Sequence, residues 1–243
     1  MDSHPLWYYR RYKDIFLRKQ NYEQEIAAIK SITSLDGQRV QEIGAGTGEF
    51  AEKILNCRVA HLEVVDYDPI AVEILRKRFA HQRNVSVIQA NGFARAAGGQ
   101  EFDVIIAMYS IILEDIFDKK NLEERILQMT TKLANKGVAI FEWIDAEISE
   151  KVYPQGMKSV VYENKEKDEI VLIESIYTPD TVTIKYSGKL EKEIIEYEAH
   201  LLSVTWREIT SILENVTRLT GGKFGMVPIE SLRRRVLGYV QKN

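Results

Sequence analysis

Two patterns of hydrophobic residues alternate along the first 143 residues of the chain. Short apolar runs such as residues 103–108 (DVIIAM) are typical of strands buried on both faces. Segments between them repeat apolar residues every three or four positions, which predicts amphipathic helices. The expected strands are 38–43, 60–66, 85–90, 103–108 and 138–143, and the expected helices are 6–32, 47–57, 69–80 and 119–134, the last ended by N-K-G at 135–137.

This alternation predicts an α/β fold with a Rossmann-like, doubly wound and mostly parallel sheet of seven strands, covered by helices on both faces. The pattern changes after about residue 150, where strand-like segments follow one another with turns between them. A capping box, T-W-R-E at 205–208, then opens a helix to about residue 215. We place the last two strands of the sheet near 216–220 and 232–240.

The expected domain organisation follows from this change of pattern. Residues 1–150 and 204–243 form one α/β domain, in which residues 1–35 are an N-terminal helical lid. Residues 151–203 form an antiparallel β insertion after the fifth strand, which we expect to cover the substrate site.

The composition argues against several classes of protein. The net charge is −3, which speaks against a main partner with a phosphate backbone, so no nucleic acid is expected. Cys57 is the single cysteine, so neither an internal disulfide nor a multi-cysteine metal site can form, and we expect no metal. With no apolar run of 18 residues and no signal-peptide core, we expect a cytoplasmic protein without a membrane partner.

The sequence V-Q-E-I-G-A-G-T-G-E-F at 40–50 places Gly44, Gly46 and Gly48 directly after a predicted strand. A phosphate-binding P-loop would need a lysine after the last glycine, and none is present. A dinucleotide fingerprint would need a third glycine at position 49, which is Glu49. A tight strand-to-helix turn without a ligand remains an alternative for a pair of glycines.

The spacing E-x-G-x-G-x-G, from Glu42 to Gly48, resembles the first motif of the class I S-adenosylmethionine-dependent methyltransferases. The resemblance implies that S-adenosyl-L-methionine is the cofactor and S-adenosyl-L-homocysteine the product. Gly44, Ala45 and Gly46 would then lie against the ligand, because backbone without a side chain permits close approach. Glu42 would lie near the ammonium group of the cofactor.

Three later positions agree with this resemblance. Asp66 ends the second predicted strand, where a carboxylate would accept both ribose hydroxyls, and Tyr67 would lie against the adenine. Asn91 follows the third strand and would read the adenine amino group. The remaining cofactor contacts implied here are Gly92 and Phe93 beside Asn91, and Met108 at the end of the fourth strand beside the sulfonium. Asp68 is expected to cap the following helix instead of binding the ligand.

The N-terminal helix and the insertion are similar in layout to the small-molecule branch of this family, in particular to sugar N-methyltransferases. In that branch an N-terminal segment closes over the cofactor, and R-K-Q-N-Y supplies Arg18 and Tyr22 for this role. The alternative is a solvated basic helix face with Tyr22 in the core. No N-P-P-[YFW] follows the fourth strand, where the sequence reads A-M-Y-S, which speaks against methylation of bases.

The expected reaction is transfer of a methyl group to a nitrogen or oxygen atom of a small molecule by in-line displacement. Positioning and exclusion of water can supply most of the rate, and a base is needed only for a protonated amine or a hydroxyl. We take Tyr109, Glu114 and His200 as catalytic candidates. Glu114 can equally be a helix N-terminal charge. The expected partner is the acceptor molecule, with a homodimer as an open option, and the alternative functions are methylation of protein or tRNA, or a silent adenosyl-binding module.

Overall fold

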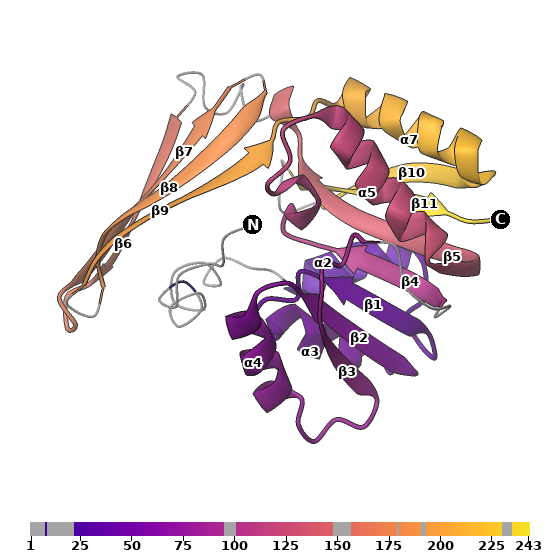
Figure 1. Cartoon of the computed structure of the whole chain (residues 1–243), viewed down its shortest axis with the longest axis horizontal. Coiled ribbons are helices and arrows are strands. Elements are labelled where there is room, and N and C mark those ends of the chain that lie inside the picture. The colour runs from indigo at the N-terminus through magenta and orange to yellow at the C-terminus, as the bar shows by residue number, and fades with distance from the viewer. Residues whose placement is uncertain are drawn as a thin grey trace.

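The computed structural model describes residue 8 and the ranges 22–94, 101–147, 157–178, 180–190, 193–229 and 235–243. Figure 1 shows a large sheet flanked by helices, and a second sheet that projects to one side. The large sheet is built from β1 (Arg39–Ile43), β2 (His61–Asp66), β3 (Val85–Gln89), β4 (Phe102–Ala107), β5 (Leu133–Ile144), β10 (Lys223–Pro228) and β11 (Arg235–Gln241).

The strand order in the large sheet is β10-β11-β5-β4-β1-β2-β3. Strands β1 to β5 run parallel, and β11 is antiparallel to both of its neighbours. This confirms the predicted mostly parallel, doubly wound sheet. The strand order reverses between β1 and β4, and sheets of this kind bind ligands at the carboxyl ends of the strands beside such a reversal.

Helices pack on both faces of the large sheet and enclose two cores. Alternation along β4 shows the division, because Ile105 enters one core while Val104 and Ile106 enter the other. The first core is covered by α5 (Lys119–Thr131) and α7 (Trp206–Thr220), and the second by α2 (Tyr22–Ile32), α3 (Glu49–Leu55) and α4 (Pro69–Arg78). Cys57 is buried in the second core.

Local capping signals in the sequence are confirmed. The Asp68 side chain accepts a hydrogen bond from the Ile70 amide at 2.8 Å and caps α4, as expected. Thr205 and Glu208 form the reciprocal capping box at the start of α7. Side-chain acceptors satisfy amides that the first helical turn leaves without partners, so both helices begin where the sequence predicts.

Two boundary predictions were wrong. Residues 216–220 are not a strand, because α7 continues to Thr220 and ends at Gly221, which has a φ of 72°. Burial of Ile212 and Val216 on the sheet favours the longer helix over the β-branched character of V-T-R-L-T. N-K-G does not end α5 either, since residues 135–137 lie within β5, where the register with β4 shifts.

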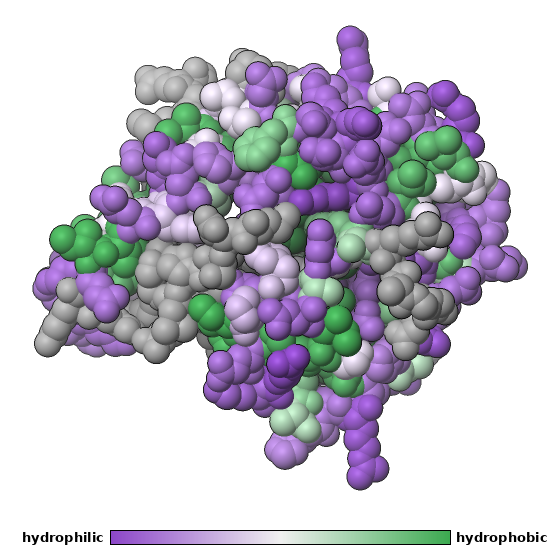
Figure 2. All heavy atoms as spheres, viewed as in Figure 1, coloured by the Kyte–Doolittle hydropathy of each residue, from purple (hydrophilic) through white to green (hydrophobic). Residues whose placement is uncertain are grey.

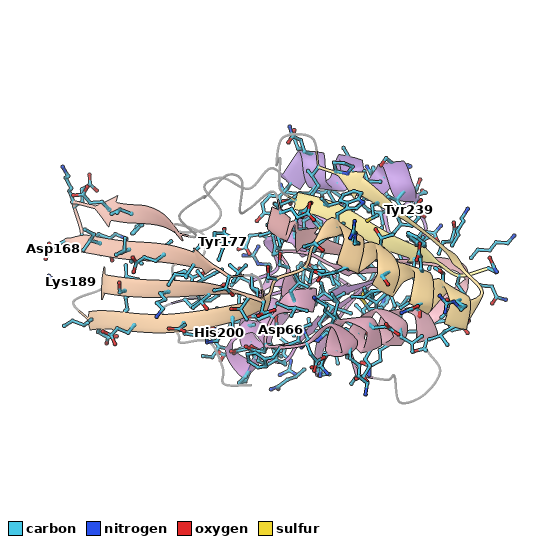
Figure 3. The ribbon with its side chains drawn as sticks, turned by 90° about the horizontal axis from the view of Figure 1, so that it is seen from above. Asp66, Asp168, Tyr177, Lys189, His200 and Tyr239 are labelled. Atoms are coloured by element: carbon cyan, nitrogen blue, oxygen red, sulfur yellow. The ribbon has the colours of Figure 1, made fainter. Side chains whose placement is uncertain are left out.

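The predicted insertion forms a separate antiparallel sheet. Its strands are β6 (Met157–Asn164), β7 (Glu169–Tyr177), β8 (Thr181–Leu190) and β9 (Glu193–Leu202), paired in sequence order. Figure 3 shows Asp168 and Lys189 at its free end, at the opposite end of the sheet from Asp66. One face exposes Val161, Ile170 and Ile194, and hydrophobic residues are visible at this end in Figure 2.

Among the described residues, no helix is both long and apolar enough to cross a membrane.

A buried ion-pair network joins α2, β5 and β11. The Arg235 guanidinium donates to both carboxylate oxygens of Glu142, and to Glu25 on α2. Glu25 is fully buried and Glu142 is 1% exposed. Burial raises the pKa of Glu25 and Arg235 opposes that rise, whereas the two carboxylates outweigh burial and raise the pKa of Arg235. The N-terminal helix is thereby held to the strand nearest the C-terminus.

We predict that Arg235→Met lowers the free energy of unfolding by about 3 to 5 kcal/mol, because two buried carboxylates lose their shared cation. Urea denaturation measures this difference. Lys77→Met is the matched control, since Lys77 forms an exposed ion pair with Glu73 at 2.5 Å. The control is expected to change stability by less than about 1 kcal/mol. Equal effects of the two substitutions would contradict the structural importance of the network.

Candidate active site

A cleft opens at the carboxyl ends of β1, β2 and β4, where the strand order reverses. Its empty volume is about 720 Å³, with the open mouth included. A second hollow of about 350 Å³ adjoins it. Both are lined by Gly44, Asp66, Tyr67, Ile111 and Glu114, so the two hollows form one elongated cleft.

The glycine loop forms one wall of the cleft, and two of its glycines have different functions. Gly44 has a φ of 70°, and a Cβ there would come within 2.5 Å of Ile111 Cγ1. Gly46 has a φ of 54°, and a Cβ there would meet no atom within 4 Å. Gly44 therefore permits close packing of the loop, whereas Gly46 leaves open space in the cleft for a ligand.

Asp66 is held rigidly at the centre of the cleft. Its Oδ2 accepts a hydrogen bond from the Gly46 amide at 2.8 Å, and its Oδ1 accepts one from the Asp68 amide at 2.9 Å. Asp66 is 7% exposed. Each carboxylate oxygen has a second lone pair, so the side chain can still accept from a ligand hydroxyl.

Glu42 is a buried carboxyl group in the cleft whose hydrogen bonding is incomplete. It is 3% exposed, and its Oε2 has no hydrogen-bond partner among the described residues. Burial raises the pKa of Glu42 well above its ordinary value, and the negative charges of Asp66 and Glu49 raise it further. A buried acceptor of this kind fits a positively charged donor, such as the ammonium group that the resemblance implies.

The second hollow contains the residues expected to hold adenine. Asn91 Oδ1 accepts a hydrogen bond from the Phe93 amide at 3.0 Å, which fixes the turn after β3. Asn91, Gly92 and Phe93 line the hollow together with Tyr67. Burial raises the pKa of Tyr67, and the nearby Glu114 raises it further, so the phenol remains neutral at physiological pH.

Arg125 is a residue of the cleft wall that we did not predict. Its guanidinium lies 4.7 Å from the Phe93 ring centroid. Its Nη1 donates to the carbonyls of Ile111, Ile112 and Glu114 at 3.2, 3.1 and 2.8 Å. Arg125 thus holds the short 3₁₀ helix η2 (Ile111–Leu113) after β4. The available signal was an arginine among the apolar positions of an amphipathic helix.

Lys132 fixes the backbone at the end of the cleft where adenine is expected. Its Nζ donates to Gln41 Oε1 at 2.7 Å and to the Gly92 carbonyl at 2.5 Å. The Gln41 amide in turn donates to Glu63 Oε1 at 2.6 Å. Burial lowers the pKa of Lys132 from 10.5 to about 8, because the charged form is poorly solvated there, although Glu63 opposes this shift.

The three catalytic candidates lie in different environments. Tyr109 lines the cleft, but its hydroxyl donates to Glu25 Oε2 at 2.8 Å. Glu114 lines both hollows, and its backbone forms an isolated bridge with Leu201 of the insertion. His200 is not among the described residues lining the cleft, and its Nε2 lies 3.4 Å from Glu198 Oε1. Proximity therefore favours Glu114 over His200 as a group that can reach a ligand.

The predicted lid contributes two described residues to the site, Tyr8 and Tyr22. Tyr22 begins α2 and lines the cleft, with its ring centroid 6.1 Å from that of Phe50. Tyr8 lines the same cleft and contacts the rings of Tyr186 and Tyr197 in the insertion. Arg18 lies outside the described residues.

The remaining predicted cofactor contacts, Ala45 and Met108, also line the cleft. All predicted cofactor residues within the described ranges are thus gathered along one cleft. In that part of the chain, no group of three or more His, Cys, Asp or Glu side chains is arranged to hold a metal ion.

Residues 40–137 match the family model described as a methyltransferase domain. This segment is similar to a methyltransferase domain. The match agrees with the predicted resemblance to class I S-adenosylmethionine-dependent methyltransferases and with the predicted enzyme class. The matched segment contains the glycine loop, Asp66 and the Asn91 turn, which are the residues on which the prediction depended.

Solved structures with the same fold include three methyltransferases. An S-adenosylmethionine-dependent methyltransferase from Clostridium acetobutylicum has a TM-score of 0.74 and 14% identity, with 98% of each chain covered. The amino pentose methyltransferase CalS10 from Micromonospora echinaspora has a TM-score of 0.70 and 16% identity, covering 100% of this chain and 99% of that one. The sugar N-methyltransferase KedS8 from Streptoalloteichus has a TM-score of 0.67 and 16% identity, covering 100% and 96%. No curated protein sequence matches the chain.

We predict that binding of S-adenosylhomocysteine releases a proton from Glu42. Because the pKa of buried Glu42 is raised, the ligand-free carboxyl carries a proton at pH values where an ordinary glutamate has lost it. An incoming ammonium favours the ionised form, so affinity rises as the pH increases. Calorimetry in phosphate and in Tris buffer, which differ in ionisation enthalpy, measures the number of protons released.

Glu42→Gln serves as the comparison for this measurement. It is expected to bind S-adenosylhomocysteine more weakly and to remove the proton release together with most of the pH dependence. Equal proton release by the variant and the wild type would place the titrating group elsewhere.

We predict that the contribution of Lys132 to the free energy of unfolding depends on pH. Its pKa is 10.5 when unfolded and about 8 when folded, so between these values the unfolded state binds more protons and stability rises with pH. The free energy of unfolding of the wild type, relative to Lys132→Met, should rise by about 2 to 3 kcal/mol across this interval. Lys136→Met, at an exposed position of β5, is the control. Parallel pH profiles for wild type and Lys132→Met would disprove the assignment.

Proposed function

We propose that the protein transfers a methyl group from S-adenosylmethionine to a nitrogen, or an oxygen, of a small molecule. The observation that supports this most is Glu42 Oε2, which is buried without a hydrogen-bond partner among the described residues. Glu42 lines the same cleft as Gly46, where the glycine loop leaves open space. The ionised form of a buried carboxyl group is unfavourable unless a cation accompanies it, so a positively charged ligand would stabilise the ionised form of Glu42.

The lining of the cleft supports the orientation of the cofactor. The Asn91 hollow takes the adenine, Asp66 accepts from the ribose, and the amino-acid end extends past Glu42 toward Tyr22 and Tyr109. The order of these groups along the cleft is the order of the parts of the cofactor. This orientation brings the sulfur close to Met108 at the end of β4.

The charge of the first hollow also favours this cofactor over a dinucleotide. All charged side chains that line it within the described ranges are carboxylates: Glu42, Glu49, Asp66 and Glu114. A pyrophosphate would be repelled by them, whereas a sulfonium and an ammonium would be attracted. Aromatic rings from Tyr22, Phe50, Tyr67 and Tyr109 complete the wall, and their faces also favour cations.

The chemistry that the protein itself must provide is limited. Bound S-adenosylmethionine supplies an activated methyl group, and the acceptor atom displaces the sulfur in line. The residues of the chain hold the two molecules in register and exclude water. Glu114, at the boundary between the two hollows, is placed to accept a proton from an acceptor or to bind a cationic one.

The contacts of the insertion support a small acceptor. Its strand β9 reaches the loop after β4, where the Asp115 amide donates to the His200 carbonyl at 3.1 Å. The Tyr197 ring stacks on Tyr186 with the ring centroids 5.7 Å apart. Burial raises the pKa of Tyr197, and the nearby Glu114 and Asp115 raise it further, so β9 lies beside the cleft. A second sheet at this side of the cleft leaves less room for a folded protein or tRNA than for a small molecule. The structural relatives described as amino pentose and sugar N-methyltransferases favour nitrogen as the acceptor atom.

We expect Asp66→Ala to weaken the binding of S-adenosylhomocysteine at least tenfold, since about 1.4 kcal/mol or more is lost with a charged hydrogen-bond pair. Titration calorimetry with S-adenosylhomocysteine and with NAD tests both the residue and the function. The wild type should bind the adenosyl ligand and not NAD. Tight binding of NAD alone would refute the proposed function, while an unchanged dissociation constant for Asp66→Ala would show only that the ribose lies elsewhere.

A further inference from the structure

Tyr109 is held in place by more contacts than a residue that only lines a cleft requires. It follows β4 with a φ of 58°, a conformation that is unfavourable for a bulky residue. Its amide donates to Glu142 Oε2 at 2.9 Å, and the Arg235 Cζ lies 5.1 Å from its ring centroid. Its ring edge meets Phe50, with the centroids 5.8 Å apart. Residues in such conformations occur often at functional sites.

The direction of the Tyr109 hydroxyl is set by Glu25. The hydroxyl donates its proton to Glu25 Oε2 at 2.8 Å, while Glu25 Oε1 accepts from Arg235. Glu25 is fully buried, and the ion pair with Arg235 prevents its carboxylate from turning away. A phenol has one proton, so a hydroxyl that donates to Glu25 can only accept from any further partner.

This arrangement also determines what Tyr109 cannot do. Loss of the hydroxyl proton would leave a phenolate against a buried carboxylate, and two adjacent negative charges with little solvent are strongly unfavourable. The surroundings of Tyr109 thus favour the neutral phenol over the phenolate. Its contribution to the site is a fixed oxygen that accepts hydrogen bonds.

We propose that Glu25 is a positioning residue that, through Tyr109, fixes a hydrogen-bond acceptor for the ammonium group at the amino-acid end of the cofactor. This inference rests on the proposed function. With the adenine in the Asn91 hollow, the amino-acid end reaches the part of the cleft lined by Glu42 and Tyr109. Glu42 Oε2 has no hydrogen-bond partner among the described residues. Tyr109 lines the same part of the cleft, and its hydroxyl, which donates its proton to Glu25, has the capacity to accept a hydrogen bond.

The test compares two ligands that differ in the amino-acid end, which includes the ammonium group of the proposed contact. S-adenosylhomocysteine has the amino-acid end, and 5′-methylthioadenosine keeps the adenine, ribose and sulfur but lacks it. Tyr109→Phe removes the hydroxyl and leaves the buried ion pairs in place. We expect it to weaken S-adenosylhomocysteine binding about tenfold in calorimetry and to leave 5′-methylthioadenosine binding unchanged.

Glu25→Gln tests the positioning role. It should weaken S-adenosylhomocysteine binding about threefold or more, again without an effect on 5′-methylthioadenosine. The double variant should bind within about twofold of Tyr109→Phe alone, because the two residues act through one contact. Tyr177→Phe on β7, which is not among the described residues lining the cleft, is the control and should change neither affinity.

The outcomes separate the inference from the proposed function. If Tyr109→Phe weakens both ligands equally, or neither, the ammonium contact is refuted. Additive losses in the double variant would refute the positioning role of Glu25. Loss of 5′-methylthioadenosine binding in Glu25→Gln would show that Glu25 supports the whole site and would refute its specific positioning role. A wild type that binds neither ligand would refute the proposed function itself.

Discussion

The position of α2 beside the site depends on one largely buried cation, the guanidinium of Arg235. It neutralises Glu142 at the end of β5 and Glu25 on α2, and it lies beside the Tyr109 ring. Without it, two carboxylates would be left in a part of the protein that water does not reach, which is a strongly unfavourable arrangement. The ion pairs place α2 against the sheet and thus bring the cleft-lining part of the lid to the glycine loop. Packing of the helix and formation of the binding site are consequences of the same interaction.

The cleft also contains a buried carboxyl group, but this one is not paired with a cation among the described residues. Arg235 satisfies its two carboxylates within the chain, whereas Glu42 keeps an oxygen without a partner. The protein therefore contains two buried acidic sites. In one, Arg235 pairs with the carboxylates of Glu25 and Glu142. In the other, Glu42 can pair with a cationic ligand. The difference between them distinguishes structural charge from charge available for binding.

The sequence predicted those features that depend on neighbouring residues. The parallel strands, the glycine loop and the carboxylate of Asp66 follow from local hydrophobic runs and from short spacings. Lys132 and Arg235 could not be predicted in this way. The side-chain partners of Lys132 and Arg235 are 91 or more residues away in the sequence, and nothing local indicates which basic residue will be buried. The strand expected at 216–220 failed for the same reason, because burial on the sheet overrode local propensity.

The insertion differs from the rest of the protein in how its contacts are distributed along the chain. Its four strands pair strictly with their sequence neighbours, while the large sheet joins strands from opposite ends of the chain. A meander of this kind closes only short loops and needs no other part of the chain to set its register. Its sequence can consequently diverge, lengthen or be exchanged with little effect on the strands that carry the glycine loop. The strands of the cleft and the strands of the insertion are therefore able to evolve at different rates within one polypeptide.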